Sequence, residues 1–187
     1  MPTRGRDPET GEEFVFFYGQ ESLFSQWHPA PFVLAGASFA TAEHWMMAAK
    51  ALLFRDEEVL AAILVAPHPR EAKALGRKVR GFDDAIWKAR SADLVYAGNH
   101  AKLAPPERRD VLLATEGATL VEASPRDRIW GIGLGASNPD ASRRARWRGQ
   151  NRLGQVLTAL RDDWLADRAD ARAARALEGL DLAMLAR

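Results

Sequence analysis

Three short apolar runs along the chain predict β-strands. The first, at 14–18, consists of aromatic and β-branched side chains and ends at Gly19, which is typical of a buried strand. The second covers 32–39 and has Gly36 near its centre, which predicts one strand or a hairpin. The third covers only 120–123. Strands therefore account for a small part of the chain.

Longer segments carry apolar residues at helical spacing and predict α-helices. Thr41 suits the N-cap of a helix over 42–54, a segment that contains neither glycine nor proline. The helix expected over 82–101 is amphipathic, and its apolar face is expected to carry Ile86, Leu94 and Val95. The other expected helices cover 56–65, 70–80, 105–115 and 151–165.

Two terminal segments and one internal segment fall outside this pattern. Residues 1–13 are rich in proline, glycine and charge, so we expect a flexible N-terminal lead. Residues 127–148 form a long loop with several glycines. Residues 166–187 are rich in alanine and arginine and predict a helical extension that packs on the core or on a partner. The predicted fold class is mainly α with a few short β-strands, with a single compact domain over 14–165.

Composition excludes several classes of protein. The chain has 187 residues, 47% of them hydrophobic and 27% charged, which is the balance of an ordinary soluble globular protein. Its formal net charge is only +1, which argues against a generic polyanion binder, although its 26 basic residues are mostly arginine. The absence of cysteine excludes disulfides, thiolate metal sites and cysteine nucleophiles.

No segment predicts export or membrane insertion. Residues 1–13 are polar and lack the apolar core of a signal peptide. No stretch approaches the roughly 18 consecutive apolar residues that a spanning helix needs. We therefore expect a cytoplasmic protein without membrane attachment, and the sequence shows no sign of an obligatory protein partner.

The helix predicted over 42–54 places an acid and a base on one side. Glu43 lies in the first turn, where unpaired backbone N–H groups and the helix dipole favour an ionised carboxylate by about 0.3–1 kcal/mol. Lys50 lies two turns further on nearly the same face, roughly 10 Å away. The two charges flank an apolar floor, as a binding site does. The alternative is structural, because glutamate is common in the first turn of helices.

Tryptophan and glycine mark a second set of candidates. Most of the six tryptophans suit a core, but Trp27, Trp130 and Trp147 fall in loop-like stretches where a flat ring can stack on them. The glycines that follow Trp130 do not form a dinucleotide-binding loop, because no helix follows them directly. They suit a sharp turn or a close approach to a ligand. Asn151 is the expected N-cap of the last core helix, whose N-terminus suits a phosphate.

Metal and serine chemistry have no support in the sequence. The four histidines do not form a ligand spacing, so we expect no metal site. His44 follows Glu43 directly and points about 100° away on a helix, so the two do not form a dyad. No serine lies in a nucleophile elbow.

Seven motifs, each weak alone, occur in an order that resembles the NADAR family, also called the YbiA-like family. The resemblance covers roughly 14–165, which is most of the chain. The motifs are Phe17-Tyr18, Phe24-Ser25-Gln26-Trp27, Thr41-Ala42-Glu43-His44 with Lys50, Gly76-Arg77, Trp87, Trp130-Gly131 and Asn151-Arg152-Leu153-Gly154.

This resemblance implies a compact, mainly helical fold and cleavage of an N-glycosidic bond in a nucleotide-like substrate. Family activities include hydrolysis of phosphoribosyl-pyrimidine intermediates of riboflavin synthesis and removal of ADP-ribose from guanine bases. The implied catalytic residue is Glu43, and no cofactor is implied. The expected partner is a small nucleotide-like molecule or an ADP-ribosylated base. The implied substrate-binding residues are Tyr18, Phe24, Ser25, Lys50, Arg77, Trp87, Trp130, Gly131 and Asn151.

The chain departs from the family pattern at one position. Some members carry an aspartate directly after the Trp-Gly pair, and this chain has Ile132 there. Asp127 and Asp140 are the nearby carboxylates that a substitute role would fall to. The departure keeps a second function open, in which the chain binds ADP-ribose or a related nucleotide without cleaving it.

Overall fold

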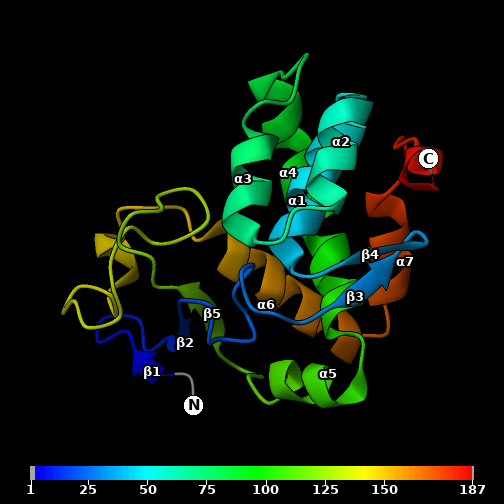
Figure 1. The fold of residues 1–187 in the computed structure, drawn as a ribbon. Helices are drawn as coiled ribbons and strands as arrows, with labels where there is room; N and C mark the ends of the chain where they lie inside the picture. The colour runs from blue at the N-terminus through cyan, green and yellow to red at the C-terminus, as the bar shows by residue number, and fades with distance from the viewer. Residues whose placement is uncertain (1–2, 187) are drawn as a thin grey trace. The chain divides into compact units, whose positions relative to one another are not determined.

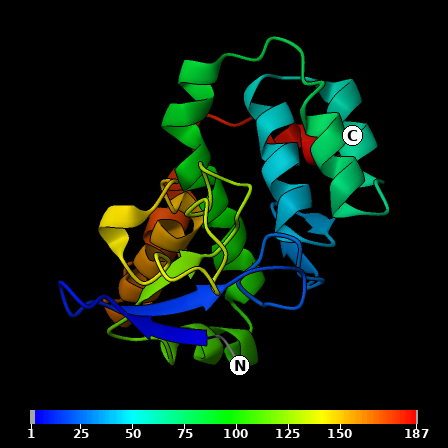
Figure 2. The same cartoon turned by 90° about the vertical axis from the view of Figure 1, so that its left-hand side faces the viewer.

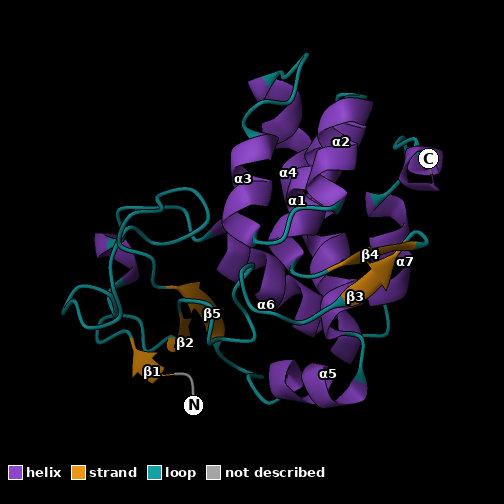
Figure 3. Cartoon of the chain, in the orientation of Figure 1, coloured by secondary structure: helices purple, strands orange, loops and turns teal. Residues whose placement is uncertain are grey.

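The computed structural model describes residues 3–186, and their secondary structure is mainly helical with a few short strands, as predicted (Figures 1 and 3). The strands are β1 (Thr3–Arg6), β2 (Glu13–Phe17), β3 (Phe32–Leu34), β4 (Ala37–Phe39) and β5 (Thr119–Glu122). The α-helices are α1 (Ala42–Leu53), α2 (Glu57–Leu64), α3 (Pro69–Gly76), α4 (Asp84–Leu103), α5 (Pro106–Leu113), α6 (Arg152–Leu165) and α7 (Ala169–Ala176). Short 3₁₀ helices are η1 (Arg144–Arg146) and η2 (Leu182–Ala186).

Backbone contacts group these elements into two compact units. The sheet unit contains residues 3–25 and 105–169, with β1, β2, β5, α5 and α6. The helical unit contains residues 26–104 and 170–186, with the β3–β4 hairpin and helices α1 to α4. The domain expected over 14–165 therefore takes segments from both units.

The sheet unit is built on three strands in the order β1-β2-β5. Strand β2 is the buried run predicted at 14–18, and it pairs antiparallel with β1 and parallel with β5. Helix α6 packs on β5, where the Thr158 hydroxyl accepts from the backbone N–H of Leu120 at 3.0 Å. The expected lead at 1–13 differs from the structure, because Thr3–Arg6 forms β1. The polar sequence of this strand gave no apolar signal, and its pairing with β2 supplies the structure.

The long loop between β5 and α6 covers one part of this sheet unit. Its apolar residues Ile132, Leu134 and Ala141 are buried with Phe14 of β2. Trp147 packs against the same cluster and donates its indole N–H to the carbonyl of Ala141 at 2.8 Å. Figure 2 shows the loop in yellow above the blue strands. The loop is therefore part of the packed core of its unit.

The helical unit is centred on α1, which packs against α2, α3 and α4. Trp45 of α1 is fully buried and donates its indole N–H to the carbonyl of Leu94 on α4 at 2.7 Å. The expected strand or hairpin at 32–39 is a hairpin, with Ala35 and Gly36 both at positive φ in its turn.

Two details of the helical unit differ from expectation. Helix α3 ends at Gly76 and not near residue 80, because the Asp56 carboxylate accepts from the Arg80 backbone N–H at 2.8 Å and from its guanidinium. These bonds lower the pKa of Asp56 to about 2. In α4, Leu94 and Val95 are buried as expected, but Ile86 is 48% exposed. The first turn of α4 is exposed, so the buried face begins further along.

The C-terminal extension packs on α4. Asp170 lies 2.7 Å from the His100 ring, and the guanidinium of Arg172 lies 4.4 Å from the ring centre of Tyr96. Arg90 donates to the carbonyls of Ala176 and Glu178 at the end of α7. Of the two expected locations for this segment, the structure therefore shows packing on the core for residues 170–178.

Candidate functional site

The predicted site residues divide between the two units. One group lies in the helical unit and comes from α1, from the C-terminal end of α3 and from α4. It consists of Glu43, Lys50, Arg77, which directly follows α3, and Trp87. The other group, in the sheet unit, consists of Tyr18, Phe24, Ser25, Trp130, Gly131 and Asn151.

Glu43 occupies the first turn of α1, as predicted. The Thr41 hydroxyl caps the helix by accepting from the His44 N–H at 3.4 Å. The backbone N–H of Glu43 donates to the carbonyl of Gln26 at 2.9 Å. Glu43 is only 4% exposed, so its carboxylate lies out of bulk solvent at the positive end of the helix dipole.

A buried amide pair fixes the backbone that holds Glu43. The side-chain N–H₂ of Asn99 on α4 donates to the Gln26 side-chain oxygen and to the Val95 carbonyl, each at 2.9 Å. Gln26 is 8% exposed and Asn99 is fully buried. Gln26 therefore connects α4 with the start of α1, because its side chain accepts from Asn99 and its carbonyl accepts from the N–H of Glu43. Asn99 was not predicted from the sequence, where its only signal was a polar residue one turn after Val95 on the expected apolar face.

His44 has a structural role at the same helix start. Its Nδ1 lies 2.8 Å from the Thr41 hydroxyl oxygen, and its Nε2 lies 3.0 Å from the Ala66 carbonyl. Burial lowers the pKa of the His44 ring, so the ring is neutral near pH 7. The partners then require Nε2–H to donate to Ala66 and Nδ1 to accept from Thr41. His44 thus connects the start of α1 with the loop after α2.

Lys50 lies in an aromatic cluster with Phe82 and Trp87. Its ammonium donates to the Gly76 carbonyl at 2.9 Å and lies 4.0 Å from the ring centre of Phe82 and 5.7 Å from that of Trp87. Burial lowers the pKa of this ammonium. Phe82 is 43% exposed, so the cluster reaches the surface. Of the predicted residues, Lys50 and Trp87 meet here, and Arg77 follows Gly76 directly and is exposed.

Phe82 and its neighbour Phe54 were missed by sequence analysis. Their rings lie 5.4 Å apart in an edge-to-face arrangement. The only sequence signal for Phe82 was the preceding Gly81, a residue type common in turns. In the structure Gly81 has φ +67° and turns the chain shortly before Asp83, the N-cap of α4. Phe82 adds a cation–π contact to Lys50 that the spacing of the motifs did not reveal.

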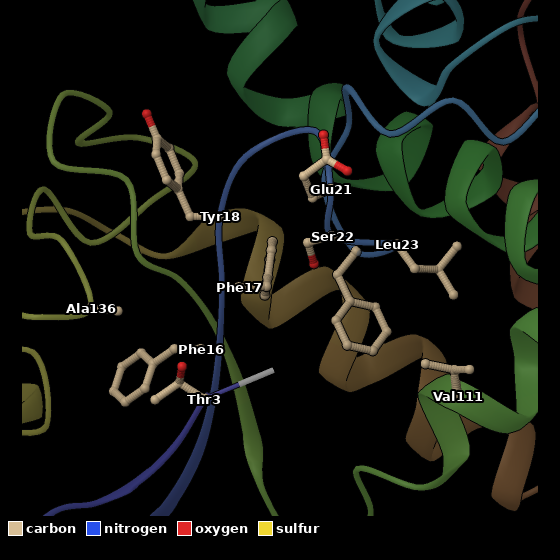
Figure 4. A pocket seen from close by; sticks show the side chains of 10 residues that line it. Thr3, Phe16, Phe17, Tyr18, Glu21, Ser22, Leu23, Val111 and Ala136 are labelled. Atoms are coloured by element: carbon tan, nitrogen blue, oxygen red, sulfur yellow. The ribbon is translucent and has the colours of Figure 1, made fainter. Parts of the chain in front are cut away.

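In the sheet unit, a cavity of about 480 Å³ opens at the end of β2 (Figure 4). Predicted residues Tyr18 and Phe24 both line it, with Tyr18 53% exposed and Phe24 buried. Ser25 is buried beside it in sequence, and its N–H donates to the carbonyl of Ser22 at 2.9 Å. The aromatic side chains of this lining suit a flat ring, and Thr3, Tyr18, Glu21 and Ser22 add polar groups. The lining residues are Thr3, Phe16, Phe17, Tyr18, Glu21, Ser22, Leu23, Phe24, Val111 and Ala136.

Trp130 and Gly131 lie against the start of α6. The Gly131 carbonyl accepts from the Asn151 N–H at 3.1 Å, and the Arg152 guanidinium lies 5.0 Å from the Trp130 ring centre. A Cβ at Gly131 would lie 2.9 Å from the Glu122 carbonyl oxygen. Close packing of the loop therefore accounts for this glycine.

Asn151 is fully buried, and its side chain connects α6 with β5. It donates to the Leu120 carbonyl at 2.9 Å and accepts from the Glu122 N–H at 3.0 Å. Asn151 stands at the expected N-cap position, but its side chain makes no capping hydrogen bond and its φ is +54°. The side chain therefore has a structural role. The phosphate site expected at this helix start is not open, because the backbone N–H groups of Asn151, Arg152 and Leu153 donate to carbonyls of the loop at 129–131.

A family model described as the NADAR domain matches residues 16–165. The chain belongs to the NADAR family. The match includes each of the predicted catalytic and substrate-binding residues, and it spans segments of both units.

Several known proteins are similar to this NADAR chain. N-glycosidase R617 of Acanthamoeba polyphaga mimivirus is 40% identical over 164 residues, covering 81% of this chain and 96% of R617. Riboflavin biosynthesis protein PYRR, chloroplastic, of Zea mays is 30% identical over 136 residues, covering 68% of this chain and 20% of the maize protein. The NMR structure of E. coli YbiA matches with a TM-score of 0.68 and 26% identity, covering 87% of this chain and 94% of YbiA.

The structure gives a physical reason for the departure at Ile132 from the NADAR pattern. Ile132 is fully buried in the apolar cluster under the loop, where an ionised aspartate would be costly. The nearby Asp127 carboxylate accepts from the N–H groups of Ile129 and Trp130, each at 2.8 Å, and so shapes a turn. In this NADAR chain the position after Trp-Gly contributes packing.

Two further kinds of feature are absent from residues 3–186. Within residues 3–186, no cluster of three or more His, Asp or Glu side chains is arranged to hold a metal ion. Over the same range, no helix is both long enough and apolar enough to cross a bilayer.

Proposed function

We propose that this NADAR protein hydrolyses the N-glycosidic bond of a nucleotide-like substrate and that Glu43 is the catalytic carboxylate. The family match and the relatives named N-glycosidase support the reaction class. The observation that carries the role of Glu43 is its position, buried in the first turn of α1 with its backbone held by Gln26.

The chemistry of the bond explains why one carboxylate has a large effect. Breaking C1′–N develops positive charge on the ribose, as in glycoside hydrolysis. A carboxylate about 4 Å from that charge, at an effective dielectric constant near 20, contributes about 4 kcal/mol, which is roughly a thousandfold in rate. The same carboxylate can also act as a general base by accepting a proton from the attacking water. General-base catalysis of this kind raises the reaction rate by about 10²–10⁴-fold.

The remaining predicted residues are proposed to hold the substrate. Lys50 and Arg77 supply positive charge for a phosphate. Trp87 in the helical unit, and separately Tyr18, Phe24 and Trp130 in the sheet unit, supply aromatic surface for a base or the ribose, and Ser25 supplies a hydroxyl. Gly131 and Asn151 are buried and hydrogen-bonded to each other, so their proposed role is to position Trp130 and the start of α6. These roles follow from residue chemistry and from the family motifs.

We propose two substrate classes, a phosphoribosyl-pyrimidine of riboflavin synthesis and an ADP-ribosylated guanine. The name of the maize relative supports the first. The test is incubation of the protein with one compound of each class, followed by chromatography of base and sugar products. Release of a free base and a sugar with a free anomeric hydroxyl is expected from one of them. Intact substrate in both reactions, with the protein folded, would contradict the proposal.

The second candidate function is nucleotide binding without cleavage. Ile132 favours it, because the carboxylate that some family members have at this position is absent here. Calorimetry with ADP-ribose run beside the product analysis separates the two functions. Binding without turnover of any substrate would support the binding module.

Lys50 gives the proposed binding site a distinctive pH dependence. Because burial lowers the pKa of its ammonium, the charge is lost at a lower pH than for an exposed lysine. Affinity for ADP-ribose is therefore expected to fall as the pH rises from neutral into the alkaline range. Lys50→Met should weaken binding at neutral pH by about 10- to 100-fold and remove the pH dependence.

Calorimetric titration across that pH range measures both effects. Lys78→Met is the matched control, since Lys78 is exposed and lies outside the aromatic cluster. Unchanged affinity in Lys50→Met would remove Lys50 from the phosphate-binding role.

A further inference from the structure

A strongly basic segment lies in the loop between β5 and α6. Residues 126–151, the basic loop, contain six arginines and two aspartates and no lysine or glutamate. This gives the loop a formal charge of +4 in a chain whose net charge is +1. The near-neutral total, which argued against a polyanion binder, therefore conceals a local excess of positive charge.

Most of the arginine side chains in this loop are not paired with carboxylates of the described residues. Five arginines of the basic loop are exposed and form no side-chain hydrogen bond or close ion pair with another residue in the described part of the chain, although the charge of Arg143 helps to lower the pKa of Asp7. They are Arg126, Arg128, Arg143, Arg146 and Arg148. By contrast, Arg144 pairs with the Glu12 carboxylate and lies 4.7 Å from the ring centre of Trp147. Arg144 anchors the loop, and the five others face solvent.

The basic loop is held in place. The Arg148 N–H donates to the Ile132 carbonyl at 2.9 Å, and the Gln150 N–H donates to the Arg128 carbonyl at 3.0 Å. These bonds set the two arms of the loop side by side. A Cβ at Gly133 would lie 3.2 Å from Cγ of Arg128 and 3.0 Å from Cβ of Arg148, so both stems flank this glycine. The apolar side chains of the loop are buried in the core of the sheet unit.

We propose that the basic loop binds the phosphate backbone of single-stranded nucleic acid. Arginine binds phosphate oxygens with two N–H groups, and five solvent-facing arginines are more than a single phosphate group requires. The loop contains only the short η1 helix, so it offers no recognition helix for the major groove of a duplex. Trp130 is partly exposed under the Arg152 guanidinium and gives an unpaired base a stacking surface.

The proposal concerns binding by the sheet unit and does not rest on the proposed role of Glu43. The test is fluorescence anisotropy with a fluorescein-labelled single-stranded oligonucleotide from about 50 to about 200 mM salt. The loop variant is Arg143→Gln/Arg146→Gln/Arg148→Gln. It should bind at least about tenfold more weakly at the lowest salt, and the slope of log K against log salt should fall by about 2.

The control carries the same loss of charge outside the basic loop. Arg55→Gln/Arg70→Gln/Arg175→Gln removes three exposed arginines, and its affinity should stay within about twofold of the wild type. Glu43→Gln should bind the oligonucleotide like the wild type, which separates this proposal from the proposed catalytic function. Equal weakening in both triple variants would overturn the proposal, as would absence of binding at low salt. Equal competition by polyglutamate or by duplex DNA would also overturn it.

Discussion

Glu43→Gln is expected to lower kcat for N-glycosidic hydrolysis by about a thousandfold. Glutamine has nearly the same shape as glutamate but carries no charge, so it cannot stabilise the positive ribose in the transition state. Because the charge develops only as the bond breaks, KM should change by no more than a few fold. Steady-state kinetics on the substrate cleaved by the wild type measures both parameters.

Glu71→Gln is the matched control for Glu43. Glu71 also lies in the first turn of a helix, α3, but it is exposed and outside the proposed site. Its replacement should leave kcat unchanged, since a first-turn glutamate contributes only about 0.3–1 kcal/mol to its helix. Circular dichroism should show that both variants are folded. A folded Glu43→Gln protein that keeps more than about a tenth of the wild-type kcat would remove Glu43 from the mechanism.

Gly154→Ala is expected to have a large effect on stability. A Cβ at this position of α6 would lie 2.1 Å from the Leu120 carbonyl oxygen and 2.4 Å from the Asn151 side-chain oxygen. The Leu120 oxygen belongs to the backbone of β5, so it cannot rotate away from the added Cβ as a side-chain atom could. The helix must therefore move away from the strand, which weakens the hydrogen bonds that Asn151 makes to β5. We expect a loss of about 3 kcal/mol in the free energy of unfolding.

Thermal and urea unfolding measure this loss, which corresponds to a Tm lower by about 6–12 °C for a chain of this size. Gly135→Ala serves as the control, because no atom lies within 4 Å of its added Cβ and its φ is outside the left-handed region. It should change stability by less than about 0.5 kcal/mol. Equal stability of the two variants would mean that α6 and β5 do not pack as closely as described.

Local sequence signals predicted most elements of the fold. The aromatic run before Gly19 predicted β2, and the Thr41 cap predicted the start of α1, because each depends on residues that are close in sequence. The strand Thr3–Arg6 had no such signal, since its structure comes from pairing with β2. The early end of α3 likewise depends on Asp56, which lies 24 residues before its partner Arg80.

The candidate site was predictable only in part for the same reason. The motifs pointed to Lys50 and Trp87, and the structure brings them together. The motifs did not point to Phe82 or Asn99, whose contacts join different elements of the helical unit. Asn151 was predicted as a cap and a ligand-binding residue, yet its amide is bonded to the backbone of β5, a partner that helix-start patterns do not reveal.

The most direct test of the central claim is hydrolysis in ¹⁸O-labelled water, followed by mass spectrometry of the separated sugar and base. We predict that the label appears on the anomeric carbon of the released sugar and that the base is unlabelled, because water attacks C1′ as the N-glycosidic bond breaks. Label on the base, or a product with the sugar–base bond intact, would contradict the account.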